Sequence, residues 1–166
     1  MIKKTFVTVG STQFDDLVKE VTNKDILKTL HNKGYRFLTV QIGRGSYVPN
    51  EGVFEGVSVS VFRYKNSLEK DFREADLIIS HGGAGSCIEA LEAKKNLIIV
   101  INHSLMHNHQ TELADALAEE GYAKWCYTNT LLTTLEEFNS RNIVEYIPGN
   151  PQKLTKYLDS LFIFKD

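Results

Sequence analysis

Residues 80–90 read Ser-His-Gly-Gly-Ala-Gly-Ser-Cys-Ile-Glu-Ala and join a predicted strand to a predicted helix. Leu77–Ile79 come just before them and form a short apolar run that is typical of a buried strand. From Cys87 onward the apolar residues recur at helical spacing, which predicts a helix that begins near Ser86. Glycines at such a turn can adopt positive φ angles, and they let a ligand approach the backbone because they lack a Cβ atom.

The first turn of this helix is suited to an anion, because it offers unpaired N–H groups and the positive end of the helix dipole. We therefore predict that a phosphorylated small molecule binds at Gly83, Ala84, Gly85 and Ser86. A turn with a purely structural role is the alternative. The segment departs from the dinucleotide-binding fingerprint, since Ile88 stands where that fingerprint has Gly or Ala, and the chain contains no Walker-type phosphate loop.

The composition of the 166-residue chain is that of one ordinary globular domain, with 42% hydrophobic and 24% charged residues. A formal net charge of −2 argues against a broad nucleic-acid interface. The only two cysteines, Cys87 and Cys126, form no disulfide framework and suit a reducing compartment. The longest apolar run, Leu97–Ile101, is too short to span a bilayer. We expect a cytoplasmic protein whose association with any membrane is indirect.

Strand-like and helix-like segments alternate along the chain. This order predicts an α/β fold, a Rossmann-like, mostly parallel sheet with helices on both faces. The predicted strands cover residues 2–9, 35–42, 57–62, 77–79, 97–101 and 123–127. The predicted helices cover residues 14–30, 68–75, 86–93, 108–120 and 131–139, and residues 43–56 are predicted to form a loop.

Ligands of such sheets bind beyond the carboxyl ends of the strands. Four predicted loops should meet at that edge, formed by residues 10–12, 63–64, 81–86 and 102–109. This convergence favours a binding site there more strongly than the glycines alone. Asp15 and Asp16 also follow the first strand, and the sequence assigns them no role.

The last segment differs in character from the rest. We expect a domain over residues 1–147 and, after the Pro-Gly-Asn-Pro break that begins at Pro148, an amphipathic helix or tail over residues 148–166. Its apolar stripe either packs back on the domain or docks on another chain.

Several of these motifs together resemble a known family. The run Ala75–Ser86, the triplet Glu89–Leu91 and the triplet Asn108–Gln110 resemble the donor-binding half of GT-B glycosyltransferases of family 28, as in the C-terminal half of MurG. With its start Phe6–Thr12 and its short length, the chain is most similar to the small catalytic subunit of the split UDP-N-acetylglucosamine transferases. The resemblance covers nearly the whole chain.

The resemblance implies the roles of several residues toward a UDP-sugar donor. The diphosphate would lie against Gly83, Ala84, Gly85 and Ser86, with further donors from Gly10, Ser11 and Thr12, and Glu89 would bind the ribose. The uracil would contact Phe62, Arg63 and Tyr64, and the sugar would contact Asn108, His109 and Gln110. Glu89 has an alternative role, because Ser86 and Glu89 have the spacing of a capping box.

The resemblance also implies the reaction. An inverting enzyme would transfer N-acetylglucosamine from UDP-GlcNAc to GlcNAc-diphospho-dolichol, the second step in assembling the lipid-linked precursor of N-glycans. We expect no cofactor and no metal, since the chain contains no Asp-x-Asp motif. His103, His107 and His109 suggest a metal site, but no carboxylate or cysteine nearby completes a ligand set, and solvated loop histidines are the ordinary explanation.

A GT-B enzyme needs a second domain for its acceptor, and this chain has no room for one. The resemblance therefore implies a separate membrane-anchored subunit, which binds the lipid-diphosphate acceptor, supplies the general base and recruits this chain to the cytosolic face of the endoplasmic reticulum. The tail over residues 148–166 is the candidate contact. Two alternatives stay open: a subunit of a split bacterial-type exopolysaccharide glycosyltransferase, and a non-catalytic module that binds nucleotide sugars.

Overall fold

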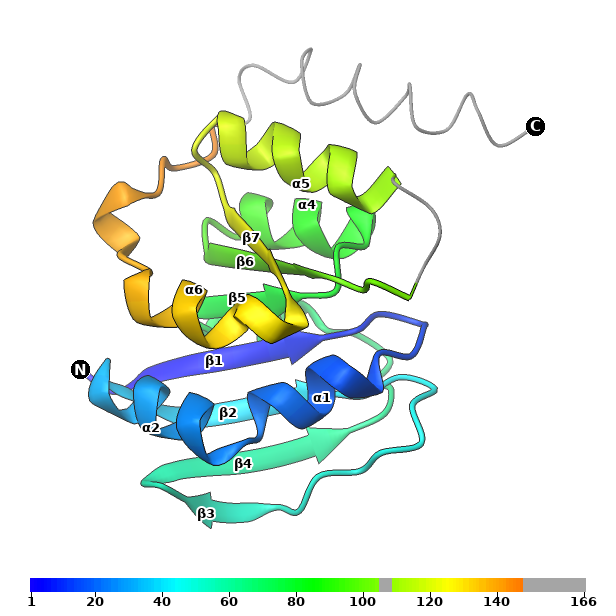
Figure 1. The fold of residues 1–166 in the computed structure, drawn as a ribbon, viewed down its shortest axis with the longest axis vertical. Helices are drawn as coiled ribbons and strands as arrows, with labels where there is room; N and C mark the ends of the chain where they lie inside the picture. Colours follow the sequence, from blue (N-terminus) through cyan, green and yellow to red (C-terminus); the bar gives the residue numbers. More distant parts are fainter. Residues whose placement is uncertain (105–108, 148–166) are drawn as a thin grey trace.

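A single seven-stranded sheet forms the centre of the protein (Figure 1). The structure, a computed structural model, describes residues 1–104 and 109–147. The strands lie in the order β3-β4-β2-β1-β5-β6-β7, and every neighbouring pair is parallel except β3 and β4. Their bounds are β1 Lys3–Thr8, β2 Tyr35–Gln41, β3 Gly52–Phe54, β4 Val57–Phe62, β5 Leu77–Ser80, β6 Asn96–Ile101 and β7 Lys124–Tyr127. The predicted α/β fold with a mostly parallel sheet is confirmed.

Helices cover both faces of the sheet. One face carries α1 (Asp15–Val21), α2 (Lys24–Asn32) and α6 (Leu131–Glu137), which Figure 1 shows in front of the strands. The other face carries α3 (Glu69–Glu74), α4 (Ala84–Glu92) and α5 (His109–Glu119). Short 3₁₀ turns, η1 (Thr128–Thr130) and η2 (Ser140–Asn142), flank α6.

The pleat of the central strands divides their side chains between two cores. In β6, Ile98 and Val100 pack with the helices of the α1 face, whereas Leu97 and Ile99 pack with α4 and α5. Successive side chains of a strand point to opposite faces, and both faces are covered here. This explains why the strand is a continuous apolar run with no polar alternation.

The predicted helix over residues 14–30 is wrong in one respect, because it is two helices. The break falls at Thr22 and Asn23. The Thr22 hydroxyl donates to the carbonyl of Val18 (2.9 Å), and the Asn23 side chain accepts from the N–H of Ile26 (2.9 Å). Asn23 is thus the N-cap of a new helix, and its extended backbone interrupts the helical path. The apolar residues keep their helical spacing on both sides of the break, so the sequence pattern gives no sign of it.

The predicted loop over residues 43–56 contains a strand that the sequence did not indicate. β3 pairs antiparallel with β4 through a two-residue turn, in which Glu55 and Gly56 both have positive φ angles (51° and 78°). Such turns match the twist of a hairpin. All three residues of β3 are exposed, so no alternation of apolar and polar residues marks the strand.

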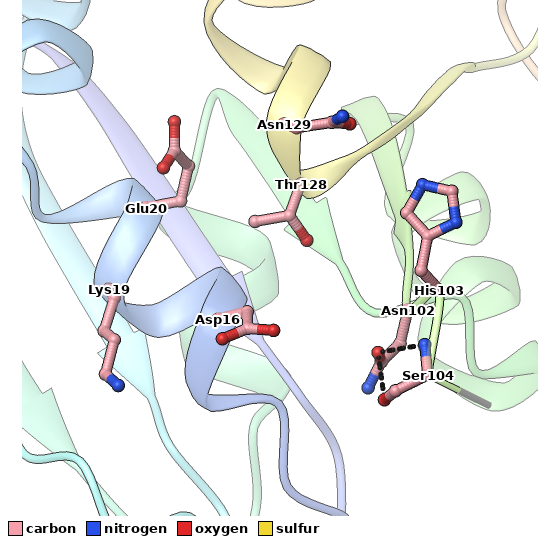
Figure 2. Close-up of a pocket in the computed structure, with 8 residues that line it drawn as sticks. All are labelled: Asp16, Lys19, Glu20, Asn102, His103, Ser104, Thr128 and Asn129. Atoms are coloured by element: carbon pink, nitrogen blue, oxygen red, sulfur yellow. Dashed lines mark hydrogen bonds between the residues drawn. The ribbon is translucent and has the colours of Figure 1, made fainter.

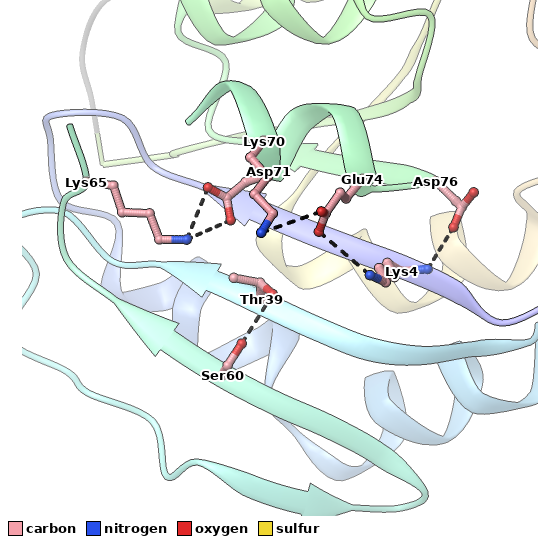
Figure 3. Close-up of polar contacts among 8 residues, drawn as sticks. All are labelled: Lys4, Thr39, Ser60, Lys65, Lys70, Asp71, Glu74 and Asp76. Carbon is pink, nitrogen blue, oxygen red and sulfur yellow. Dashed lines mark hydrogen bonds and ion pairs between the residues drawn. The ribbon is translucent and has the colours of Figure 1, made fainter. Parts of the chain in front are cut away.

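The crossover from β4 to β5 runs through the short helix α3, which lies against β1. Figure 3 shows the polar contacts around this helix. The Asp76 carboxylate accepts a hydrogen bond from the backbone N–H of Lys4 (2.8 Å). The Lys4 and Lys70 ammonium groups both pair with Glu74, at 3.7 and 3.8 Å. Exposed ion pairs contribute little free energy, so the buried Phe72 is the main anchor of α3.

Two predictions concern the ends of the described chain. The tail predicted over residues 148–166 lies outside the described residues, and the boundary at residue 147 stays a prediction. Within residues 1–104 and 109–147, no helix is both long and apolar enough to cross a membrane.

Candidate functional site

The carboxyl edge of the sheet gathers the predicted loops. β1, β4 and β5 run parallel within one sheet, so the segments that follow them emerge at the same edge. These segments begin at Val9, Arg63 and His81, and contacts join all three. Three of the four predicted loops therefore meet at this edge; the fourth, over residues 102–109, follows the parallel strand β6 and lies partly outside the described residues.

The glycine-rich turn ends in an open helix terminus. α4 begins at Ala84, two residues before the predicted start, with Gly83 as an N-cap whose backbone is extended. No side chain caps this terminus, and the first turn has no acidic residue. A Cβ atom built on Gly85 would meet nothing within 4 Å, so this part of the turn faces open space. Free N–H groups and a positive dipole end without a competing carboxylate suit a phosphate.

The earlier start of α4 overturns the capping-box alternative for Glu89. Ser86 is the third residue of the helix, so it is not the N-cap, and Glu89 lies a further turn along. The Glu89 side chain is largely exposed to solvent. The part of it that is buried raises its pKa, and the nearby charges of Glu69 and Glu92 raise the pKa further. A carboxylate among like charges suits sugar hydroxyls better than a second anion, and the ribose contact of Glu89 stays a prediction.

His81 links the glycine-rich turn to the loop after β1. A Cβ atom added to Gly83 would lie 2.5 Å from Nε2 of His81, and one added to Gly10 would lie 3.0 Å from Cε1. The ring therefore fits between two positions that tolerate only glycine. Nδ1 lies 3.3 Å from the carbonyl oxygen of Thr8, which can only accept, so Nδ1 carries the proton and Nε2 keeps a free lone pair.

Burial lowers the pKa of His81 below its usual value, and the hydrogen bond to Thr8 opposes this in part. The sequence places His81 in one of the predicted rim loops and assigns it no contact with a ligand. Only the fold shows that the His81 ring contacts both Gly83 and Gly10.

Gln41 is a site residue that the sequence analysis missed. This residue is 1% exposed and ends β2. Its Oε1 accepts from the hydroxyl of Thr8 (2.7 Å) and from the N–H groups of Val9 and Gly10 (both 3.0 Å). Its Nε2 donates to the carbonyls of Gly10 (2.7 Å) and Arg63 (2.8 Å). One amide thus fixes the loop after β1 to the loop after β4. The only signal in the sequence was a polar residue between Val40 and Ile42.

The predicted uracil-contacting residues have other contacts within the chain. The Phe62 ring stacks with Phe6, with ring centroids 6.3 Å apart. Nη1 of Arg63 donates to the carbonyls of Gly43 (3.1 Å) and Gly45 (2.7 Å), so this side chain braces the loop after β2. The Tyr64 hydroxyl donates to the carbonyl of Ser11 (3.4 Å), which places Tyr64 beside the predicted phosphate loop Gly10–Thr12. A contact of these three residues with a base stays a prediction.

Part of the predicted sugar-contacting triplet reaches the same site. Gln110, in the first turn of α5, has its Cβ 3.5 Å from the position of a Cβ built on Gly82. Asn108 and the side chain of His109 lie outside the described residues. So does His107, which leaves the three-histidine metal hypothesis untested; in the part of the chain that is described, no three potential metal ligands cluster.

An open helix terminus and a rim of loops at the carboxyl edge of a Rossmann-like sheet form the kind of edge at which such sheets bind phosphorylated ligands. Residues 5–155 match the Glycosyltransferase family 28 C-terminal domain, and the chain belongs to this family.

Comparison with individual proteins shows which members of the family this chain is similar to. UDP-N-acetylglucosamine transferase subunit ALG13 of Mus musculus is 48% identical over 130 residues, which are 78% of this chain and 11% of that relative, so the chain matches about a tenth of the relative's length. The NMR solution structure of ALG13 has a TM-score of 0.74 and 25% identity and covers 96% of this chain and 97% of its own. Acinetobacter baumannii MurG, with 22% identity and a TM-score of 0.59 over 82% of this chain and 40% of its own, shares the fold.

We expect the Gln41→Leu substitution to destabilise the protein by about 2 kcal/mol or more, because it leaves several buried backbone groups unpaired. Urea unfolding followed by circular dichroism measures this change. Gln13→Leu is the matched control, since Gln13 is exposed and should change the free energy of unfolding little. Equal stability of the two variants would contradict the bracing role of Gln41.

His81 should make the protein less stable in mild acid. Its folded-state pKa is lowered, so the unfolded chain binds the proton first, and the free energy of unfolding falls as the pH drops below about 6.5. Urea midpoints measured between pH 8 and pH 5 should fall more steeply for the wild type than for His81→Gln. Parallel pH profiles would show that burial of the imidazole does not couple to folding.

Proposed function

We propose that the chain is the donor-binding, catalytic subunit of an N-acetylglucosaminyltransferase. In this proposal it transfers N-acetylglucosamine from UDP-GlcNAc to GlcNAc-diphospho-dolichol, the second step of lipid-linked oligosaccharide assembly for N-glycosylation. The observation that carries the proposal is the uncapped N-terminus of α4 beside the loop Gly10–Thr12, in a chain whose relatives are named UDP-N-acetylglucosamine transferase subunits.

In the proposed glycosyl transfer, negative charge develops on the diphosphate as it departs. The acceptor hydroxyl attacks the anomeric carbon on the face opposite UDP, the bond to the diphosphate breaks, and the configuration inverts. The N–H groups of Ala84, Gly85 and Ser86 are fixed by the helix, so they stabilise the departing diphosphate without reorganising. Helix N–H groups take the place that a divalent metal has in enzymes with an Asp-x-Asp motif, and we propose that this reaction needs no metal.

The proposal includes a second chain. The relatives are named as subunits, which supports a heteromeric enzyme. We infer a membrane-anchored, Alg14-like subunit that binds the lipid-diphosphate acceptor, supplies the general base and holds this chain at the cytosolic face of the endoplasmic reticulum. The tail over residues 148–166, with its apolar stripe, is the proposed contact.

The direct test is transfer of labelled N-acetylglucosamine from UDP-GlcNAc to a lipid-diphosphate GlcNAc acceptor, with and without the membrane-anchored partner. We expect transfer only with both chains present, undiminished by EDTA. A chain that ends at Gly149 should keep UDP binding and lose the partner in a pull-down. If the pair binds UDP-GlcNAc and transfers nothing to this acceptor, the proposed acceptor is wrong.

The Gly85→Asp substitution should abolish UDP binding without unfolding the protein. The added side chain enters open space, and an acidic residue in the first turn of a helix is stabilising, whereas its charge repels the diphosphate. Isothermal titration with UDP measures the loss, and thermal unfolding monitors the fold. Gly85→Ala is the matched control and should retain binding. Undiminished affinity of Gly85→Asp would place the diphosphate elsewhere.

The Glu89→Gln substitution should weaken UDP binding about tenfold or more, because a hydrogen bond from a ribose hydroxyl to a carboxylate is stronger than one to an amide. The midpoint of thermal unfolding should stay unchanged, since the described residues give Glu89 no capping role. Glu92→Gln, one turn further along α4, is the control and should bind UDP like the wild type. Equal affinities for all three proteins would remove the ribose contact.

A further inference from the structure

A second hollow lies at the carboxyl edge of the sheet, on the α1 face (Figure 2). It has a volume of about 470 Å³, within the range of small-molecule sites. Three separate segments line it: α1, the residues after β6, and η1. The side chains that matter below are those of Asp16, Asn102, His103, Thr128 and Asn129.

The position of the hollow is one where the topology favours a ligand. After β1 the chain turns to the α1 face, and after the neighbouring strand β5 it turns to the α4 face. Ligands of open α/β sheets bind at such a switch point. The terminus of α4 lies on the α4 face of this edge, and the hollow lies on the α1 face. The segment that begins at Asn102 connects the two sides, because it leads to the start of α5.

The polar groups around the hollow have unused hydrogen-bonding capacity. Within the described residues, the side chains of Asp16, Thr128 and Asn129 make no hydrogen bond or ion pair. Oδ1 of Asn102 accepts from the N–H (3.1 Å) and the hydroxyl (2.7 Å) of Ser104, which fixes the amide and leaves its Nδ2 free. Figure 2 shows Asp16 and Asn102 on opposite sides of the space.

The charge of the hollow selects the class of ligand. Asp16 and Glu20 bring negative charge, whereas the Lys19 ammonium lies 5.4 Å from the centre of the Tyr47 ring and points away in Figure 2. A phosphate would be repelled. In the part of the chain that is described, no three potential metal ligands cluster, which disfavours a divalent cation. A neutral ligand with many hydroxyl groups fits the carboxylate, amides and hydroxyl.

One wall of the hollow is a rigid ring surface. The His103 ring stacks on Tyr127 with centroids 3.7 Å apart and planes 16° apart, and Trp125 meets Tyr127 edge-on at 5.4 Å. Trp125 is fixed in turn by a hydrogen bond from its indole N–H to Asp115 (2.9 Å). A flat ring beside the Asp16 carboxylate, the free Nδ2 of Asn102 and the Asn129 amide matches a sugar ring with neighbouring hydroxyls.

We propose that this hollow binds a neutral sugar ring and, on the function proposed above, that the ring is the N-acetylglucosamine of the acceptor. Asp16 accepts a hydrogen bond from a sugar hydroxyl, and Asn102 and Asn129 hold its neighbours. The donor-binding chain then shares the acceptor with its partner: the partner binds the lipid diphosphate, and this chain orients the sugar beside the donor.

The test is an NMR titration of the full-length, ¹⁵N-labelled chain with methyl α-N-acetylglucosaminide, a neutral probe, alone and with saturating UDP-GlcNAc. We expect saturable shifts at the Asn102 side-chain amide and at the backbone of Thr128 and Asn129, and the same shifts with UDP-GlcNAc present. Asp16→Asn should weaken this binding about tenfold or more. Asp25→Asn, an exposed carboxylate in the first turn of α2, is the matched control and should leave it unchanged.

Two results would overturn the inference: no saturable shift around the hollow, or shifts at Ala84–Ser86 and Gln110 that UDP-GlcNAc abolishes, since the sugar would then belong to the donor. The titration with UDP-GlcNAc tests the proposed function separately. A chain that binds the saccharide in the hollow and fails to bind UDP-GlcNAc would contradict the proposed function and support the sugar site.

Discussion

The buried amide of Gln41 is the interaction on which the rim depends. The side chain of Gln41, which is 1% exposed, accepts from two backbone N–H groups after β1 and donates to one carbonyl each from the loops after β1 and β4. Leaving such groups unpaired is costly, so the two loops have one arrangement available to them. His81 extends the brace, because its ring lies between Gly10 and Gly83. The open start of α4 therefore faces a loop of fixed shape.

In this arrangement, the side chains that brace the rim differ from the groups that remain available to a ligand. The side chains of Gln41, His81 and Arg63 hold the rim, and each donates a hydrogen bond to a backbone carbonyl of the chain itself. The groups left for a ligand are the N–H groups of α4, the Glu89 carboxylate and the polar lining of the hollow by α1. In the proposed reaction, stabilising the leaving diphosphate requires donors that do not move, and the N–H groups at the start of α4 are such donors.

The switch between β1 and β5 produces two unlike surfaces at one edge. On the α4 face, a helix terminus without an acidic first turn favours negative charge. On the α1 face, Asp16 and Glu20 disfavour it. A transferase must hold a charged nucleotide and a neutral sugar a short distance apart and keep them from exchanging places. In the proposed function, opposite electrostatics on the two faces meet that need.

The sequence by itself determined the mostly parallel α/β fold, six of the seven strands of the sheet and the position of the glycine-rich turn, since apolar spacing and glycines at a strand end act locally. It did not determine the start of α4, the break at Asn23 or the strand β3, because neighbouring residues there carry no period that distinguishes the alternatives. Gln41, the second contact of His81 and the hollow lined by Asp16, Asn102 and Asn129 emerged only from the tertiary structure. The residues that each of them brings together lie 22 to 113 positions apart in the chain, and a sequence pattern records no contact across such distances.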